Sequence, residues 1–191
     1  MEFKSSEEYE NKLKSQLKDF LNKSDSWSPE DFLSIKSYLF PINNHITYLL
    51  GKKFLDTLSI PDDNFKYTDM NNNGYDLEIF FKDKLIVAEI KGNIPCGSNG
   101  TYGAQQKAKI KENLDCLCDK SKKTKSNLTV EEFNKAYKFI ILLDNNKAAM
   151  ENLSKNANKK EIKYHLHYPN EISWESFSKD KINVIFIKLN G

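Results

Sequence analysis

The sequence contains no arginine, so all 29 of its basic residues are lysines. Any reading of DNA bases would therefore proceed without the guanidinium group, which pairs with guanine through two parallel hydrogen bonds. Lysine, asparagine, glutamine, serine and main-chain groups would have to take its place. The formal net charge of +2 is too small to indicate a nucleic-acid partner, so that evidence must come from local patterns.

Cysteine and long hydrophobic runs are also scarce. Cys96, Cys116 and Cys118 form neither a CxxC pair nor an even set, so we expect reduced thiols and no structural zinc site. No apolar run is long enough to span a membrane, and the first ten residues lack the apolar centre of a signal peptide. We therefore expect a cytoplasmic protein without a membrane partner.

The 191 residues suffice for one domain with a substantial core. With 39% hydrophobic and 29% charged residues, the chain falls among soluble globular proteins rather than disordered ones. We predict a single domain over 1–191, with a helical N-terminal part over about 1–60 and a core over about 65–191.

Hydrophobic periodicity predicts the secondary structure. Helical spacing indicates helices over 6–22, from Ser28 to about Phe40, and over 43–58, with Pro41 breaking the second from the third. The later part of the chain alternates strands and helices: a hairpin within 73–93, helices at 102–119, 129–136 and 146–155, and strands at 137–144, 161–168 and 182–189. The predicted fold class is α/β, with a mixed central β-sheet flanked by helices.

Charged residues interrupt the predicted hairpin in a regular way. A two-residue loop at Asp83 and Lys84 would place Leu77 opposite Ile90 and Glu78 opposite Glu89. One face would then be core, formed by Leu77, Ile79, Phe81, Ile86, Ala88 and Ile90.

The other face of the hairpin would bring together Asp76, Glu78, Glu89 and Lys91. Carboxylates directly opposite each other repel unless water screens them or a cation binds between them, and Mg²⁺ would relieve that repulsion. The alternative is an ordinary solvent-exposed face on which Lys91 pairs with Asp76. Two features argue against it: residues 85–92 are apolar on both faces, and a glycine-rich polar loop follows.

Asp76, followed after an apolar strand by Glu89-Ile90-Lys91, resembles the PD-(D/E)XK signature of restriction-endonuclease-like nucleases. The resemblance covers roughly residues 70–106 and implies an αβββαβ core. Tyr75 stands where the family name calls for proline. No acidic residue of the N-terminal helices can be assigned as an additional metal ligand, which leaves the number of metal ions open.

The resemblance implies a Mg²⁺-dependent nuclease, in which Mn²⁺ can substitute. Asp76, Glu89 and the carbonyl of Ile90 would hold the ion, with Glu78 as a further ligand. Lys91 would orient or help to deprotonate the attacking water. Gln106, which is in register with the apolar stripe of its helix, resembles a glutamine that some members carry after the lysine.

Further residues are candidates for contacts with double-stranded DNA. The loop after the hairpin could bind phosphate or reach base edges, and the lysine-rich stretch 107–125 is either a solvated face or a phosphate track. The DNA-binding candidates are Ser98, Asn99, Thr101, Tyr102, Gln105, Lys107 and Lys109.

The function expected by analogy is that of a small type II restriction endonuclease, a homodimer that cuts both strands of a short specific site. Two alternatives remain open. One is a structure-selective nuclease of the same fold, such as a Holliday-junction resolvase or a repair nuclease. The other is a binding module that keeps the hairpin but has no catalytic activity.

Overall fold

The computed structural model divides the chain into two compact units, Met1–Ile42 and Asn43–Gly191. For residue 29 and residues 31–41 it describes the backbone alone. The residues it describes are 11, 14, 15, 18, 22, 29–61, 74–94, 100–143, 147–168 and 172–189. Within the first unit, the four described residues 11, 14, 15 and 18 are helical.

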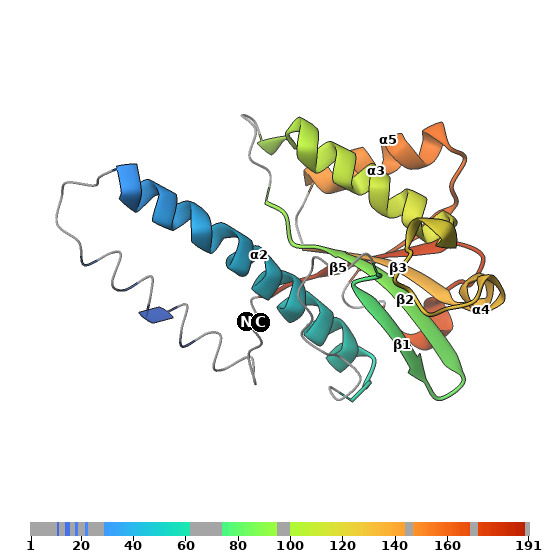
Figure 1. Ribbon diagram of the computed structural model, residues 1–191. Coiled ribbons are helices and arrows are strands. Elements are labelled where there is room, and N and C mark those ends of the chain that lie inside the picture. Colours follow the sequence, from blue (N-terminus) through green and yellow to red (C-terminus); the bar gives the residue numbers. More distant parts are fainter. Residues whose placement is uncertain are drawn as a thin grey trace. The chain divides into compact units, whose positions relative to one another are not determined.

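The second unit is built on a five-stranded sheet with the order β1-β2-β3-β5-β4 (Figure 1). The strands are β1 (Leu77–Phe81), β2 (Lys84–Lys91), β3 (Tyr137–Leu143), β4 (Tyr164–His167) and β5 (Ile182–Ile187). β1 runs antiparallel to β2, whereas β2, β3, β5 and β4 are parallel. The predicted mixed sheet is confirmed. β3 and β5 are apolar on both faces because helices cover both sides of the sheet.

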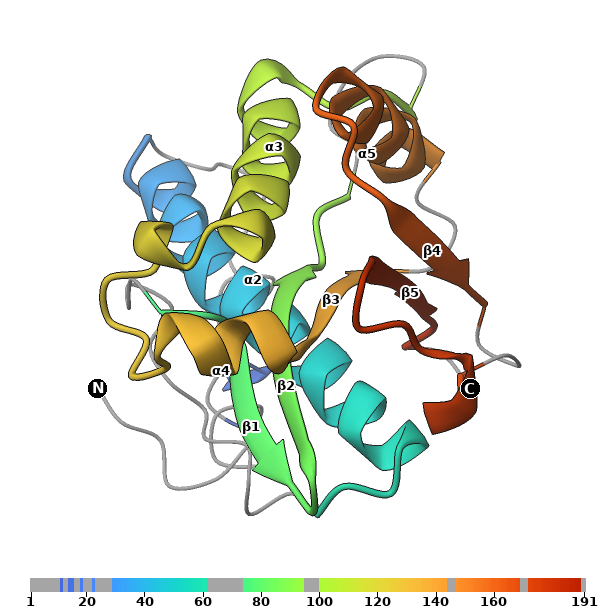
Figure 2. The same cartoon turned by 90° about the vertical axis from the view of Figure 1, so that its right-hand side faces the viewer.

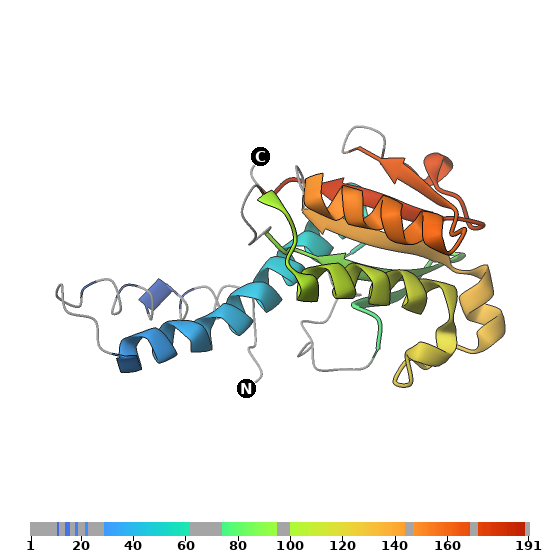
Figure 3. The same ribbon diagram turned by 90° about the horizontal axis from the view of Figure 1, so that it is seen from above.

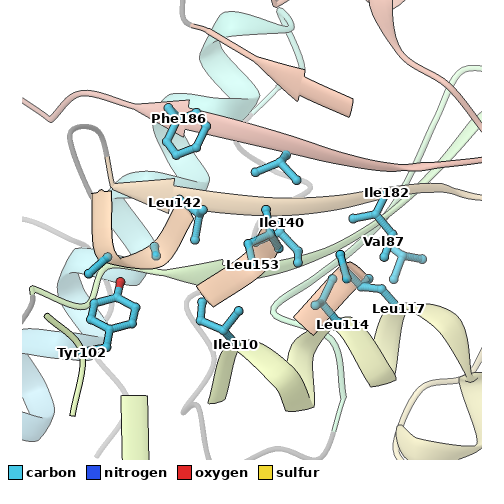
Figure 4. Packing of buried hydrophobic residues seen from close by; sticks show 14 of the residues in the cluster. Val87, Tyr102, Ile110, Leu114, Leu117, Ile140, Leu142, Leu153, Ile182 and Phe186 are labelled. Carbon is cyan, nitrogen blue, oxygen red and sulfur yellow. The ribbon is translucent and has the colours of Figure 1, made fainter. Parts of the chain in front are cut away.

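Two longer helices, α3 (Ala104–Cys118) and α5 (Lys147–Lys159), lie side by side on one face of this sheet (Figure 3). Their apolar stripes pack on alternate strand residues such as Val87, Ile140 and Val184 (Figure 4). The short helix α4 (Val130–Lys135) joins the same layer through Phe133. Its start is fixed by Thr129, whose hydroxyl accepts a hydrogen bond from the Glu132 N–H.

The opposite face of the sheet is covered by the end of helix α2 (Pro29–Thr57) (Figure 2). Leu50, Phe54 and Leu55 of this helix are fully buried in a second core cluster. That cluster contains all the hairpin residues predicted for the core: Leu77, Ile79, Ile86, Ala88 and Ile90 are buried, and Phe81 packs against them. The prediction of which hairpin face is core is confirmed.

Helix α2 differs from the sequence prediction at Pro41. We expected this proline to separate two helices, but α2 continues through it for 29 residues in all, so the prediction is wrong. Proline removes one backbone hydrogen bond and crowds the preceding turn, which a long helix can absorb when its remaining turns are intact. The boundary between the two compact units falls directly after this position.

Between α2 and α3, the described residues contain two strands, where the resemblance to the nucleases implies three. Residues 62–73 lie outside the described part of the chain. None of the helices within the described ranges has both the length and the hydrophobicity needed to cross a bilayer.

Gly92, which follows β2, marks a close approach between the sheet and α2. A Cβ atom at this position would clash with Cγ2 of Ile46 and would lie 3.4 Å from Cδ1 of Leu50. We expect Gly92→Ala to lower the free energy of unfolding by about 1–3 kcal/mol, because overpacking forces the helix away from the sheet. Chemical denaturation measures the change. In the matched control Gly74→Ala, where a Cβ meets nothing within 4 Å, we expect a change below about 0.5 kcal/mol. Equal losses in both variants would contradict this account.

Candidate active site

The candidate site lies on the α3 side of the hairpin formed by β1 and β2. Asp76 directly precedes β1, while Glu89 and Lys91 lie at the C-terminal end of β2. Side chains alternate between the two faces of a strand. Since Ile90 points into the α2-side core, Glu89 and Lys91 point to the other face.

The hairpin turns one residue earlier than predicted. Its loop is Lys82-Asp83, and Lys82 has a φ of 54°, a left-handed conformation that suits the first position of a tight hairpin loop. Leu77 therefore pairs with Ala88, and Glu78 pairs with Val87 instead of Glu89. The predicted opposition of Glu78 and Glu89 is wrong. The partner of each residue moves by two positions, which leaves every side chain on its predicted face.

The observed register places Asp76 beside the end of β2. Its Oδ2 atom accepts a hydrogen bond of 2.7 Å from the backbone N–H of Ile90. The same oxygen lies 3.7 Å from Nζ of Lys91, and both side chains are only 16% exposed. The ion pair between Lys91 and Asp76, which the solvent-face alternative also predicted, is present. Its low exposure is unlike that of an ordinary solvated face.

Glu89 is the most deeply buried charged group of the site. Its side chain is 3% exposed, and its Oε1 atom lies 2.5 Å from Nζ of Lys123. Burial and the charge of Asp76 raise the pKa of Glu89 to about 7, although Lys91 and Lys123 act in the opposite direction. Burial is the largest single effect and lowers the pKa of Lys123, but Glu89, Cys116 and Asp76 together outweigh it, so the pKa is raised.

Lys123 belongs to the connector after α3, where it caps the short 3₁₀ helix η3 (Lys120–Lys122). Its ammonium also donates a 2.9 Å hydrogen bond to the carbonyl of Gly74 and lies 5.5 Å from the centre of the Tyr75 ring. Sequence reasoning placed this lysine in a basic stretch but did not connect it to Glu89. No local signal distinguishes Lys123 from its neighbours, because the contact joins residues far apart in the chain.

Tyr75 forms one wall of the site. Its ring stacks on Phe133 at a centroid distance of 5.8 Å, and its hydroxyl donates to the carbonyl of Cys116 at 3.1 Å. Burial, followed by the nearby charge of Cys116, raises the pKa of this tyrosine. The hydroxyl thus has a structural role: its hydrogen bond connects the segment before β1 to α3.

Gln106 lies in the first turn of α3 and contacts the segment that leaves β2. Its Oε1 accepts a hydrogen bond from the N–H of Gly103 at 3.1 Å, and its Nε2 donates to the carbonyl of Ile94 at 2.7 Å. The amide oxygen therefore takes part in capping the helix, and the amide nitrogen holds the segment that leaves β2. In this arrangement Gln106 positions the loop rather than presenting its amide to the carboxylates.

The residues predicted to bind DNA differ from one another in their exposure to solvent. Tyr102 is 2% exposed, lies in the α3-side core and donates to the carbonyl of Asn93 at 3.3 Å. Its ring packs in this core, and its contact with DNA stays a prediction. Thr101, Gln105, Lys107 and Lys109 are exposed, and Lys109 pairs with Glu112 at 2.7 Å. Ser98 and Asn99 lie outside the described residues.

The oxygen atoms near Lys91 fit a hard divalent cation. Because the N–H and C=O groups of one strand residue point to the same side, the Ile90 carbonyl also lies on the side of Asp76. Two carboxylates and one carbonyl are oxygen ligands of the kind that Mg²⁺ accepts. Glu78 is exposed. Within the described ranges, His, Cys, Asp and Glu side chains form no group of three or more that could hold a metal.

No family model, no curated protein and no solved structure matches the chain.

The raised pKa of Glu89 makes a pH-dependent contribution to stability. A carboxyl group whose pKa rises from 4.5 to about 7 on folding stabilises the folded state below the lower value, and this stabilisation is lost as the pH rises through the upper one. We expect the free energy of unfolding of the wild type, minus that of Glu89→Gln, to fall between about pH 5 and about pH 8. Urea denaturation across this range measures the difference.

Glu131→Gln serves as the control, because Glu131 lies on the exposed surface of α4 with its side chain 78% exposed. For this variant the difference from the wild type should stay nearly constant over the same range. A difference that is constant or rises with pH for Glu89→Gln would show that Glu89 is not protonated more readily in the folded protein.

Proposed function

We propose that this protein is a metal-dependent endonuclease that hydrolyses phosphodiester bonds in DNA. The observation that carries the proposal is the convergence of Asp76, Glu89 and Lys91 at the end of β2, in poorly solvated surroundings. Burying two carboxylates and an amine together costs free energy, so a site of this kind favours a functional role over a purely structural one. The resemblance to the PD-(D/E)XK signature gives these three residues a shared chemistry.

Asp76, Glu89 and the carbonyl of Ile90 are the groups that would hold Mg²⁺ or Mn²⁺. When bound, such an ion neutralises charge on the scissile phosphate and lowers the pKa of a bound water. Mg²⁺ commonly retains several waters and takes only one or two carboxylates from a protein. Two carboxylates therefore suffice for one ion of this kind.

Lys91 lies next to Asp76, and its ammonium can donate a hydrogen bond to the attacking water and orient it toward phosphorus. The water oxygen forms a bond to phosphorus while the bond from phosphorus to one bridging sugar oxygen breaks. The water loses a proton to solvent, and the departing oxygen takes one up from solvent. The products are a phosphomonoester and a hydroxyl group.

The exposed side chains of Thr101, Gln105 and Lys107 at the start of α3 are candidates for contacts with the DNA backbone. Cutting at a short specific site, as in a restriction enzyme acting as a homodimer, is the more detailed form of the proposal. A structure-selective nuclease is the alternative. The pattern of cutting distinguishes them, since specific sites give discrete fragments whereas branch recognition requires branched DNA.

The proposal is tested by incubating the protein with mixed-sequence plasmid in the presence of Mg²⁺ or Mn²⁺. We expect cleavage by the wild type, and a rate lower by about 100-fold or more for Asp76→Asn and Lys91→Met. Asp76→Asn preserves an acceptor for the Ile90 N–H, so the loss would reflect the missing charge rather than misfolding.

Asp83→Asn and Lys82→Met are the matched controls, because both residues lie in the exposed hairpin loop. They should cleave at the wild-type rate. Intact plasmid and intact branched DNA with both metals would overturn the nuclease proposal. Wild-type rates for Asp76→Asn and Lys91→Met would place the activity elsewhere.

A further inference from the structure

A lysine ammonium lies at one of the two carboxylate oxygens of Glu89, which the proposed function assigns to the metal ion. Nζ of Lys123 is 2.5 Å from Oε1 of Glu89, which is closer than the 3.7 Å between Lys91 and Asp76. The Lys123 side chain is itself only 13% exposed. This contact is therefore a desolvated ion pair, unlike a surface pair that water can replace at little cost.

The charges of the site balance without a metal. When Glu89 is ionised, Asp76 and Glu89 supply two negative charges, and Lys91 and Lys123 supply two positive ones. Adding a divalent cation to this arrangement would leave an excess of positive charge in a region of low solvation, which is unfavourable. One of the two ammonium groups would have to withdraw for the ion to bind tightly.

Lys123 is the amine better placed to withdraw. Lys91 belongs to β2, whereas Lys123 belongs to a connector whose neighbouring residues Lys122, Thr124 and Lys125 are exposed. Its ammonium also contacts the carbonyl of Gly74 and the Tyr75 ring. A lysine side chain has a long flexible stem, so its head group can move to solvent while the backbone stays in place.

We propose that Lys123 is an internal counter-cation that competes with the divalent ion for Glu89, so that metal binding displaces its ammonium. This inference rests on the proposed nuclease function, because it takes Asp76 and Glu89 as the metal ligands. The ammonium stabilises the buried carboxylate while no metal is bound. It thereby makes metal affinity weaker than the oxygen ligands alone would give.

The experiment measures binding of Mn²⁺ alone, without DNA, by calorimetry and by thermal unfolding, with all proteins at about pH 8, where Glu89 of the wild type is mostly ionised. Lys123→Met keeps most of the stem that covers Tyr75 but removes the charge. We expect this variant to be less stable without metal, to bind Mn²⁺ on the order of tenfold more tightly than the wild type, and to gain more thermal stability from it.

Lys122→Met is the matched control. Lys122 is the preceding residue of the same connector, and it pairs with Asp115 at 3.4 Å instead of Glu89. It changes the net charge by the same amount, so any long-range effect of charge would appear in both variants. Tighter binding in Lys123→Met than in Lys122→Met supports the specific role of Lys123.

The remaining outcomes separate the two proposals. If the wild type binds Mn²⁺ and Lys123→Met binds it equally or more weakly, Lys123 is a structural partner and this inference is wrong while the nuclease proposal stands. If neither protein binds Mn²⁺, both fall. If Lys123→Met unfolds without metal, recovery of its melting transition on adding Mn²⁺ supports the inference, and failure to recover overturns it.

Discussion

The buried carboxylate of Glu89 is the constraint around which this part of the molecule is organised. A carboxylate with 3% of its side chain exposed is strongly disfavoured in its charged form unless cations lie close to it. The ammonium groups of Lys91, in the same strand as Glu89, and of Lys123, in the connector after α3, both favour the charged form of this carboxylate. The cost of burying these charges is balanced within the site, which keeps the carboxylates close together and poorly hydrated.

The unequal lengths of β1 and β2 create the place for this cluster. Pairing with β1 stops at Ala88, so among the described residues no strand lies beside the last residues of β2 on that side. The Asp76 side chain accepts from the Ile90 N–H where a neighbouring strand would have supplied a carbonyl. A backbone group that would otherwise lack a partner is thereby satisfied, and the carboxylate is fixed at the strand end.

The two faces of the hairpin have different roles: the α2 side packs in the core, and the α3 side carries the charged residues of the candidate site. On the α2 side, the hairpin presents mainly apolar residues, and Gly92 allows the helix to approach closely. On the α3 side, the core of Val87, Ile140 and Leu114 continues up to the charged cluster, with Tyr75 between them. A rigid apolar face behind the strand holds the charged face in a fixed position, as a catalytic site requires.

The sequence by itself determined the secondary structure of the second unit and the face to which each hairpin residue points. Both depend on short-range periodicity: strand side chains alternate, so even a register error of two residues left Glu89 and Lys91 on the correct side. Asp76, Glu89 and Lys91 were also identified from the sequence alone, through their resemblance to the PD-(D/E)XK signature.

Only the tertiary structure decided which groups meet. The pairing of Glu89 with Lys123, the burial of Tyr102 and the hydrogen bond from Gln106 to the Ile94 carbonyl join segments that no local pattern connects. The continuation of α2 through Pro41 likewise went against the local preference for a break. Local patterns report the conformational preference of a few neighbouring residues, whereas ion pairs and buried contacts form when chain segments distant in sequence pack together.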